Sequence, residues 1–509
     1  MVLRHGWLLG LAVAWAAVPA LGQAPSGKKE PKKHAEARPA KPSKSVTIAQ
    51  TTSAPAPSQP GIPHTLAEAL AATYSNQPAL QAERAKLRAT DENVPQALAG
   101  WRPTVVLAGT GGWGDGKSAL GAGSPATRTD RLIGTAQATV SQPLYTGGKT
   151  QANTNKAKNQ VMAERATLIS QEQTSFLQTV SAYVGNGSSA GIGVIQAQQL
   201  LALAINNEQV LAKQLQATND RFRVGEITRT DVAQAEAALA GATASRQQAE
   251  GNLQTARGNY QQVVGFFPPG DLVEPQPLAL PVKTEQEAIA MASNNNPQVI
   301  AALFNDASAK DAIDVALAQL MPTVSVIGQM NYNKNGTLPR TETSGYQAVV
   351  QLQVPIYQGG AEYSSVRQAR QSAQQTTRQV EDARRTAVQN AIQSWETLVA
   401  AKASAASTRE QIRANQIALE GVEREAIVGS RTTLDVLNAQ QALLNSRTTL
   451  VQNLAQVVNT SYQVAAAVGR LTARDLHLPV PLYDERAYYD AVKNKWTGLG
   501  DYATDQPGR

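Results

Sequence analysis

The sequence contains no cysteine, and this absence excludes several kinds of function together. Disulfides, thiolate metal sites and cysteine nucleophiles all need a thiol. Histidine is almost as scarce, with only His5, His34, His64 and His477. No nucleophile motif, phosphate-binding loop or metal-ligand spacing stands elsewhere in the sequence. We therefore expect no enzyme activity, no metal and no cofactor.

Long apolar runs are missing from the sequence beyond its N-terminus. Arg4 precedes an apolar run over 7–17, and the small residues Ala20 and Gly22 follow it. This pattern predicts a secretory signal peptide over 1–22. The run is too short for a membrane anchor, which needs about 20 apolar residues, and no later segment reaches that length. We therefore expect no transmembrane helix in the mature chain.

The basic charge of the chain is concentrated in one segment. The net charge is +7, and residues 1–62 hold eight lysines and arginines against two glutamates. The remainder is nearly neutral, so we expect no nucleic-acid partner. Residues 23–62 are rich in proline, alanine, serine and lysine, which predicts a disordered linker. Binding of this linker to cell wall or to an anionic surface is the less favoured interpretation.

The chain repeats itself. The motif QPLYTGG at 142–148 returns as VPIYQGG at 354–360, and VGEITRTD at 224–231 returns as VGSRTTLD at 428–435. Landmarks that recur in the same order at matched spacing indicate internal duplication. Half of the chain therefore explains the whole.

The duplication sets the domain boundaries that we predict. Repeat 1 covers residues 63–270, repeat 2 covers 271–477, and a tail follows over 478–509. The tail holds four tyrosines and Trp496. Its sequence leaves two interpretations open, because the tail either wraps the middle of the molecule or is disordered.

Each repeat contains a predicted β-hairpin, at 102–145 and at 323–356. The strands have about 10 residues each, which crosses a membrane when they are tilted, and aromatic residues stand near their ends. Four strands cannot close a barrel within one chain, because the smallest membrane barrels have about eight strands. Membrane strands would therefore force several chains to share a barrel. A small soluble sheet is disfavoured, since the strands are glycine-rich and the hairpins lie far apart in sequence.

The rest of each repeat is predicted to be helical. Helical segments precede the hairpins at 65–100 and 285–320, and we expect Pro78 and Pro95 to interrupt or kink the first of them. Proline-free arms follow the hairpins over 144–267 and 356–478. Apolar residues in the second arm recur every seven positions in two adjacent rows, which indicates coiled-coil packing on two sides.

The arms are unusually long, and each contains a turn. A helix from Gly360 to Gly429 would measure on the order of 100 Å, which suits an object that bridges a gap. The Val-Gly motifs near 224–231 and 428–435 mark the far turns, where glycine fits a left-handed cap and Thr-Asp begins the next helix. The first copy is eight residues longer than the second at the segment 185–193, which is rich in glycine. We therefore predict a bulge or a looped-out break there.

These landmarks resemble the TolC family of outer-membrane channel tunnels. The resemblance covers about 63–475, and the second turn, VGSRTTLDVL at 428–437, matches especially well. It implies a mixed α and membrane β fold, in which a long antiparallel helical coiled-coil tunnel joins a shared outer-membrane β-barrel. It also implies a homotrimer, with four strands per chain and about twelve in the barrel. The implied location is the outer membrane of a Gram-negative bacterium, with the helical tunnel in the periplasm.

The resemblance also implies a function and partners. Relatives of this kind export small toxic molecules and drugs, and some take part in type I secretion of proteins. The tunnel would open when it is docked to an inner-membrane RND or ABC transporter through a periplasmic adaptor, a membrane fusion protein. The tips that match the adaptor-docking positions are Val224, Gly225, Val428 and Gly429.

The family's gate maps onto both turns. In the resting state a gating arginine bonds to a Thr-Asp pair, and the matching residues are Arg431 with Thr230 and Asp231. Such a bridge would tie the inner helix pair to the outer one. The family also has a tyrosine in this network, and Ala426 stands at its position. We therefore expect the tyrosine's part of the gate network to be absent from this chain.

The family's constriction has two acidic rings, and this chain matches one of them. Asp435 stands at the first position, and Asn438 stands at the second. Three copies of Asp435 would still attract cations, but we expect weaker cation selectivity than two rings would provide.

One further class of function competes with the tunnel. A passive trimeric surface stalk or adhesin would also combine a coiled coil with a shared barrel, without transport. A stalk needs only one helical run per chain, so the duplicated hairpins and paired turns favour the hollow tube. The sequence names neither the cargo nor the pump.

Overall fold

The computed structural model describes residues 61–506, apart from 119–122, 124, 126, 188–190 and 337–339. The predicted signal peptide and nearly all of the predicted linker lie outside the described residues. Within these ranges, no helix has both the length and the apolar character needed to cross a bilayer.

Prolines divide the helical segment ahead of each hairpin at equivalent places. In repeat 1 the segment forms α1 (Leu66–Asn76), α2 (Pro78–Asp91) and α3 (Asn93–Leu98). In repeat 2 it forms α7 (Glu285–Asn295) and α8 (Pro297–Leu317). Pro78 and Pro297 each occupy the first turn of a new helix, where the missing N–H costs nothing. The interruption predicted at Pro78 is therefore confirmed as a helix start, whereas Pro95 lies inside the short α3.

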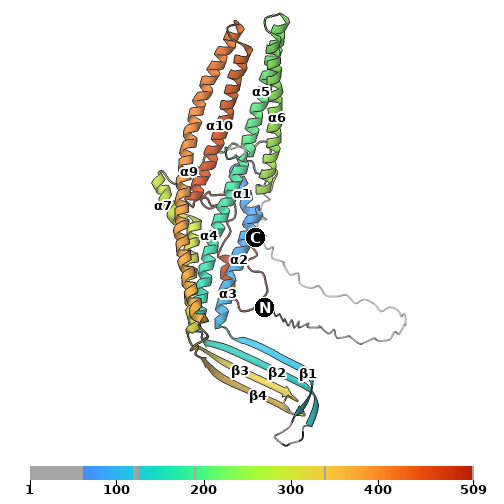
Figure 1. Ribbon diagram of the computed structural model, residues 1–509, viewed down its shortest axis with the longest axis vertical. Coiled ribbons are helices and arrows are strands. Elements are labelled where there is room, and N and C mark those ends of the chain that lie inside the picture. Colours follow the sequence, from blue (N-terminus) through green and yellow to red (C-terminus); the bar gives the residue numbers. More distant parts are fainter. Residues whose placement is uncertain are drawn as a thin grey trace, which may run out of the picture. The chain divides into compact units, whose positions relative to one another are not determined.

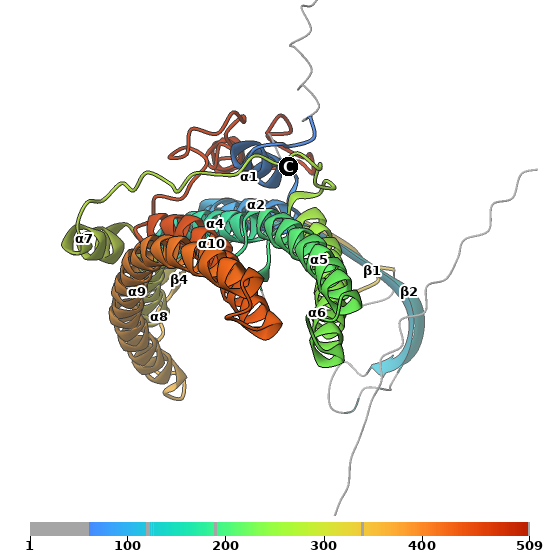
Figure 2. The same cartoon turned by 90° about the horizontal axis from the view of Figure 1, so that it is seen from above.

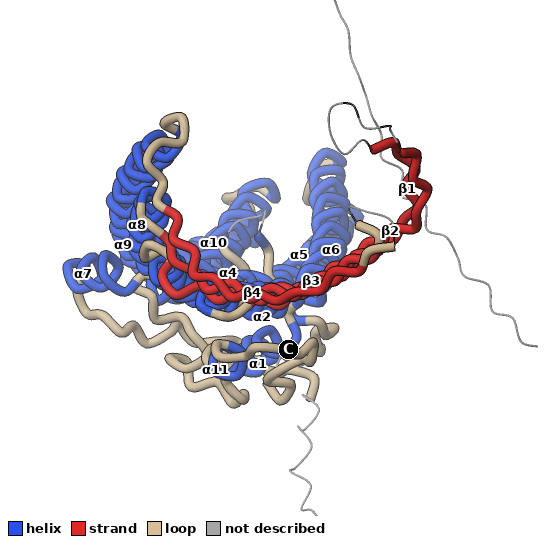
Figure 3. Tube along the Cα trace, turned by 90° about the horizontal axis from the view of Figure 1, so that it is seen from below, coloured by secondary structure: helices blue, strands red, loops and turns tan. Residues whose placement is uncertain are grey.

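The two hairpins join into one antiparallel sheet in the order β1-β2-β3-β4 (Figures 1 and 3). The strands are β1 (Thr104–Ser118), β2 (Thr127–Tyr145), β3 (Thr323–Lys334) and β4 (Glu342–Gln353). Thr104 pairs with Ser141, and Gly134 pairs with Lys334 across the junction between the hairpins. Every residue of β4 is exposed within the single chain. The sheet thus lacks a covering layer along its last strand.

Two consecutive glycines turn each hairpin into a helix. Gly147 and Gly148 have φ of 65° and 83°, and Gly359 and Gly360 have φ of 78° and 84°. Residues with a side chain rarely adopt these left-handed conformations, whereas glycine does so without steric cost. The doubled Gly-Gly of the repeated motif therefore has one structural reason in both copies.

Long helices follow each hairpin. Repeat 1 continues with α4 (Lys149–Tyr183), α5 (Val194–Arg223) and α6 (Arg229–Val264). Repeat 2 continues with α9 (Ala361–Ile427) and α10 (Thr433–Ala467). Helix α9 has 67 residues, close to the predicted length. Helices α5 and α6 form one antiparallel pair, and α9 and α10 form the other (Figures 1 and 2).

The seven-residue rows of α10 are largely core positions. Val436, Leu443, Val457 and Val464 of the first row are buried. Val458 and Ala465 of the second row are buried as well. Helix α10 contacts α9 on one side and α4, α5 and α6 on the other, so both rows meet a neighbour. The predicted packing on two sides is confirmed.

The first arm is broken where the extra residues lie. Helix α4 ends at Tyr183 and α5 begins at Val194. The backbone leaves and returns at nearly the same point: a Cβ on Gly193 would lie 2.1 Å from the amide nitrogen of Gly185. Two bonds seal this base, from the N–H of Asn186 to the carbonyl of Gly191 (2.8 Å) and from the N–H of Gln196 to that of Val184 (3.3 Å). The predicted looped-out break is confirmed.

The C-terminal tail packs against the helices of repeat 1. The N–H of Tyr483 donates to the hydroxyl of Tyr74 (3.0 Å), and the guanidinium of Arg84 lies over both rings, 4.5 Å from Tyr74 and 5.1 Å from Tyr483. The short helix α11 (Ala487–Val492) packs against α2. Of the two open interpretations, the structure supports a tail that binds to the helices.

Two carboxyl groups are buried where the tail meets α2 and α4. Burial raises the pKa of Asp91 to about 7, although Arg165 and Arg88 act to lower it. Neither carboxylate oxygen of Asp91 has a hydrogen-bond partner among the described residues. Burial also raises the pKa of Glu172 to about 7, and its carboxylate accepts the N–H of Ala473 (2.6 Å). An ionised carboxyl group without full hydrogen bonding costs stability in such a place.

The closely packed base of the loop predicts a specific mutational effect. Gly193→Ala places a methyl group against the backbone of Gly185 and Val184, which has no free rotation to relieve the clash. We expect a loss of roughly 1–3 kcal/mol, seen as a lower thermal unfolding midpoint. Gly241→Ala in α6 is the matched control, because nothing lies near its Cβ. Equal unfolding midpoints for the two variants would contradict this account.

Asp91 predicts a pH dependence of stability. Its folded-state pKa lies above its unfolded value, so the folded state holds the extra proton, and stability falls as pH rises from about 4 to about 7. Asp91→Asn does not titrate there, and its unfolding midpoint should fall less than that of the wild type over this range. Asp382→Asn on the exposed face of α9 is the control. Parallel pH profiles of wild type and Asp91→Asn would refute the assignment.

Candidate functional site at the helix tips

The far end of each helix pair turns in the same way. Gly225 and Gly429 have φ of 81° and 80°, which only glycine adopts readily. In the first turn the N–H of Glu226 donates to the carbonyl of Arg221 (3.0 Å). In the second the N–H of Ser430 donates to that of Glu425 (3.0 Å). These bonds satisfy the last carbonyls of the incoming helix, so the tip is a defined turn and not a frayed end.

Each outgoing helix begins with a capping box. The carboxylate of Asp231 accepts the backbone N–H (3.0 Å) and the hydroxyl (2.7 Å) of Thr228. The carboxylate of Asp435 accepts the same two groups of Thr432 (3.0 and 2.9 Å). The N–H of each aspartate donates in turn to the threonine hydroxyl. The predicted gate and constriction aspartates therefore also hold the helix starts together.

The chain by itself does not bring the predicted gate residues together. The guanidinium of Arg431 donates to Glu425 across its own turn (2.9 Å), and both side chains are about half exposed. This contact raises the pKa of Arg431 above its ordinary value. The recorded side-chain partner of Asp231 in the described chain is Thr228, and Thr230 is exposed. A bond between the two tips is thus still a prediction.

The sequence analysis missed Glu425 as the partner of Arg431. The first tip holds an equivalent pair, in which Arg221 donates to Glu226 (3.0 Å). In each case opposite charges stand five or six residues apart on the two sides of a turn glycine. That spacing was the signal available in the sequence.

The predicted constriction residues lie on one face of α10. Asp435 and Asn438 are three residues apart, so they are neighbours on the helix surface. Asn438 is exposed and Asp435 is partly so. The backbone N–H and hydroxyl of Thr432 lower the pKa of Asp435, which keeps this carboxylate ionised near neutral pH. Ala426, at the position of the family tyrosine, is buried.

The docking positions at the tips are open to solvent. Val224 and Val428 are 72% and 78% exposed, and Gly225 and Gly429 are exposed beside them. Single exposed apolar residues are common on protein surfaces, but these two valines stand at equivalent places on the two turns. The turns are rigid and apolar at their tips, with charged residues behind them.

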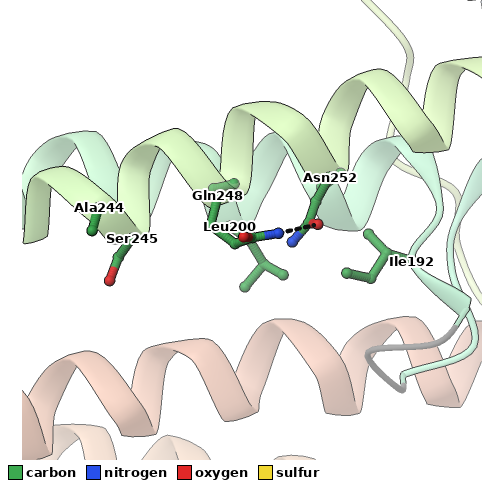
Figure 4. Close-up of a pocket in the computed structure, with 8 residues that line it drawn as sticks. Ile192, Leu200, Ala244, Ser245, Gln248 and Asn252 are labelled. Atoms are coloured by element: carbon green, nitrogen blue, oxygen red, sulfur yellow. Dashed lines mark hydrogen bonds between the residues drawn. The ribbon is translucent and has the colours of Figure 1, made fainter. Parts of the chain in front are cut away.

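A shallow pocket lies between α5 and α6, beside the break in the first arm (Figure 4). Ile192, Leu200 and Ala244 give it apolar walls, and the amide of Gln248 donates to Asn252 (3.1 Å). It contains no titratable group. Within the described ranges, no cluster of three or more histidine, aspartate or glutamate residues could hold a metal. This pocket therefore offers packing surface and not a reaction site.

Comparison with known proteins assigns the family. The model of the family described as "Outer membrane efflux protein" matches residues 69–265 and 288–470, which are the two repeats. The chain belongs to this family. Its resemblance to TolC-like channels is thereby confirmed, and so is its place in the outer membrane.

Individual relatives agree with this assignment. The chain is 36% identical over 447 residues to the outer membrane efflux protein BepC of Brucella suis, covering 87% of this chain and 93% of that protein. It is 26% identical over 315 residues to the outer membrane protein TolC of Vibrio cholerae, covering 60% and 72%. The solved outer-membrane channel OprN has the same fold, with a TM-score of 0.67 at 18% identity over 79% of this chain and 89% of that one.

This efflux-family chain is mostly helical and contributes four antiparallel strands, as the sequence predicts. BepC is named as an outer membrane efflux protein, TolC as an outer membrane protein and OprN as an outer-membrane channel. The family model leaves out residues 266–287, which connect the repeats, and the tail after residue 470.

The capping boxes predict a difference between two neighbouring threonines. Thr228→Val removes the cap of α6 and should cost about 1 kcal/mol locally. Amide hydrogen exchange over residues 229–232 should then be about fivefold faster. Thr230→Val has the same chemistry without a recorded side-chain bond, and it should leave the exchange nearly unchanged. Similar exchange in the two variants would show that the cap does not hold the tip.

Proposed function

We propose that three copies of this chain form a channel that exports small toxic molecules and drugs across the periplasm and the outer membrane. The observation that carries the proposal is the four-stranded sheet, which the chain leaves open at β1 and β4. Open edges cannot stand in a bilayer, since each unpaired N–H or carbonyl there costs several kcal/mol. Three sheets joined edge to edge give a barrel of about twelve strands, within the range of membrane barrels.

The helices support a tunnel behind that barrel. At 1.5 Å per residue, α9 alone reaches on the order of 100 Å. The two helix pairs lie side by side along an arc and together form a curved wall (Figure 2). Three such walls would enclose a space along their length. A passive stalk has no need of a curved wall that encloses a space.

The exposed tips support docking to other proteins. A periplasmic adaptor would bind the apolar turns at Val224, Gly225, Val428 and Gly429, and an inner-membrane RND or ABC transporter would supply the cargo and the energy. Two matched tips per chain present six docking turns in a trimer. The same tunnel would also serve secretion of proteins, since its wall makes few contacts that are specific for one cargo.

In this proposal, the state of the gate depends on which of two sets of partners Arg431 binds. In the closed trimer Arg431 bonds to Thr230 and Asp231, and in the open state it returns to Glu425, its partner within the single chain. The pair with Glu425 is exposed and of little strength in water, so an exchange between the two acids costs little. Asp435 then lines the constriction with one acidic ring, beside the neutral Asn438.

Single-channel conductance in planar bilayers tests the channel and the gate together. The gate variant is Asp231→Asn with Arg431→Gln, because asparagine keeps an acceptor for the cap of α6 and removes only the charge. The wild type should show small, cation-preferring steps, and the gate variant should show clearly larger ones. Arg223→Gln is the control, since it removes an exposed tip charge outside the gate.

Each outcome separates one part of the proposal. Steps that stay unchanged in the gate variant would keep the channel and reject the gate. A folded trimer without any conductance would reject transport and favour the passive stalk. Larger steps in Arg223→Gln as well would show a general charge effect at the tip.

A further inference from the structure

The end of the chain forms a closed loop against the helices of repeat 1. The N–H of Asp484 donates to the side-chain carbonyl of Gln506 (3.0 Å), so residues 484–506 return to their starting point. Between these ends, the hydroxyl of Tyr488 donates to Glu92 on the C-terminal side of α2 (2.9 Å). We call this segment, residues 484–506, the tail loop.

The tail loop descends along α2 and α3 toward the sheet. Tyr483 lies against Arg84, which belongs to the first half of α2. Tyr489 packs against Val94 of α3, and Arg165 of α4 lies 5.4 Å from its ring. Helix α11 lies against α2 (Figure 3). Successive tail residues thus meet successive turns of the helices that lead to β1.

The far end of the tail loop, residues 495–499, lies at the start of β1, and we call it the apex. The guanidinium of Arg102 donates to the carbonyl of Lys495 (2.6 Å) and lies 5.0 Å from the ring of Trp496. Strand β1 begins two residues after Arg102, at Thr104. This inference rests on the proposed function, in which the four strands cross the outer membrane and this junction stands at the periplasmic surface of that membrane.

The apex presents apolar side chains to the outside. Trp496 is 67% exposed and Leu499 is fully exposed. Gly498, between them, has φ of 123°, a conformation that turns the backbone outward and excludes most other residues. Trp101, on the other side of Arg102, is also exposed. Two large apolar side chains this exposed and this close in sequence indicate a surface that another apolar phase can cover.

The charges at the apex fit a phospholipid surface. Lys495 is exposed, and its ammonium lies 4.6 Å from the ring of Tyr502, whereas Lys493 is paired with Asp490 (2.7 Å). Tryptophan and tyrosine favour the boundary between headgroups and acyl chains, because their rings are apolar on one side and polar on the other. Lysine beside them can reach lipid phosphates while its stem lies along the apolar layer.

We propose that the tail loop is a membrane-surface anchor, in which Trp496 and Leu499 enter the periplasmic leaflet of the outer membrane next to β1. The occupant is the phospholipid bilayer itself. A docking protein is less well matched, since the exposed tips that suit one lie at the other end of the long helices. The stack of Arg102 on Trp496 ties the anchor to the strand–helix junction, so the tail loop braces the point where the channel leaves the membrane.

The absence of cysteine makes a direct test available. Leu499→Cys supplies a single thiol for a bimane label, and the trimer is placed in vesicles of phosphatidylethanolamine and phosphatidylglycerol that contain a lipid with a nitroxide near the top of its acyl chain. Leu107→Cys in β1, on an exposed strand position, is the lipid-facing reference. Ala491→Cys on the exposed side of α11 is the water-facing reference.

We expect the nitroxide lipid to quench the label at 499 about twofold or more above the label at 491, and to approach the value at 107, because an interfacial side chain meets the upper acyl chain. Adding Trp496→Ser should lower quenching at 499 toward that at 491. Quenching at 499 equal to that at 491 would overturn the proposal. A label shielded from a water-soluble quencher but not reached by the lipid would assign the apex to a neighbouring copy and would overturn it as well.

Discussion

Backbone hydrogen bonding of the four-stranded sheet is the constraint on which the rest of the molecule depends. The inner strands β2 and β3 are paired on both sides, whereas β1 and β4 are paired on one. A sheet with open edges and exposed faces cannot stay alone in lipid or in water. The surrounding architecture serves this need, because long helices hold the hairpins of two distant repeats next to each other. Pairing of β2 with β3 joins residues almost two hundred positions apart.

The duplication extends to individual hydrogen bonds. Both repeats convert strand to helix with two left-handed glycines, and both tips combine a left-handed glycine with a Thr–Asp capping box. The same aspartates, Asp231 and Asp435, are the ones that the family resemblance assigns to the gate and the constriction. In the proposed channel, the charge that takes part in the gate or the constriction is therefore held in place by the bond that starts the helix. Removing the whole aspartate side chain would remove both the helix cap and the negative charge, whereas a change to asparagine would remove only the charge.

Much of the fold could be predicted because its signals are local. Proline is favoured at the first position of a helix, as at Pro78 and Pro297, and doubled glycines permit turns that other residues resist. The break at 185–193 was visible as a mismatch between two copies of one pattern. The candidate site was predicted less completely. The positions of Arg431, Asp231 and Asp435 follow from matched turns, but the partner of Arg431 within the chain is Glu425, because flexible side chains choose among several acids at similar distance.

The sequence by itself determined the duplicated helices, the four strands, the two tips and the family. These depend on backbone preference and on the spacing of apolar residues, which act over a few positions. Only the tertiary structure decided the route of the tail, the burial of Asp91 and the contact of Trp496 with Arg102. Each of these joins residues hundreds of positions apart through aromatic, ionic or desolvation energies. Such energies depend on which surfaces meet, and no local pattern records that.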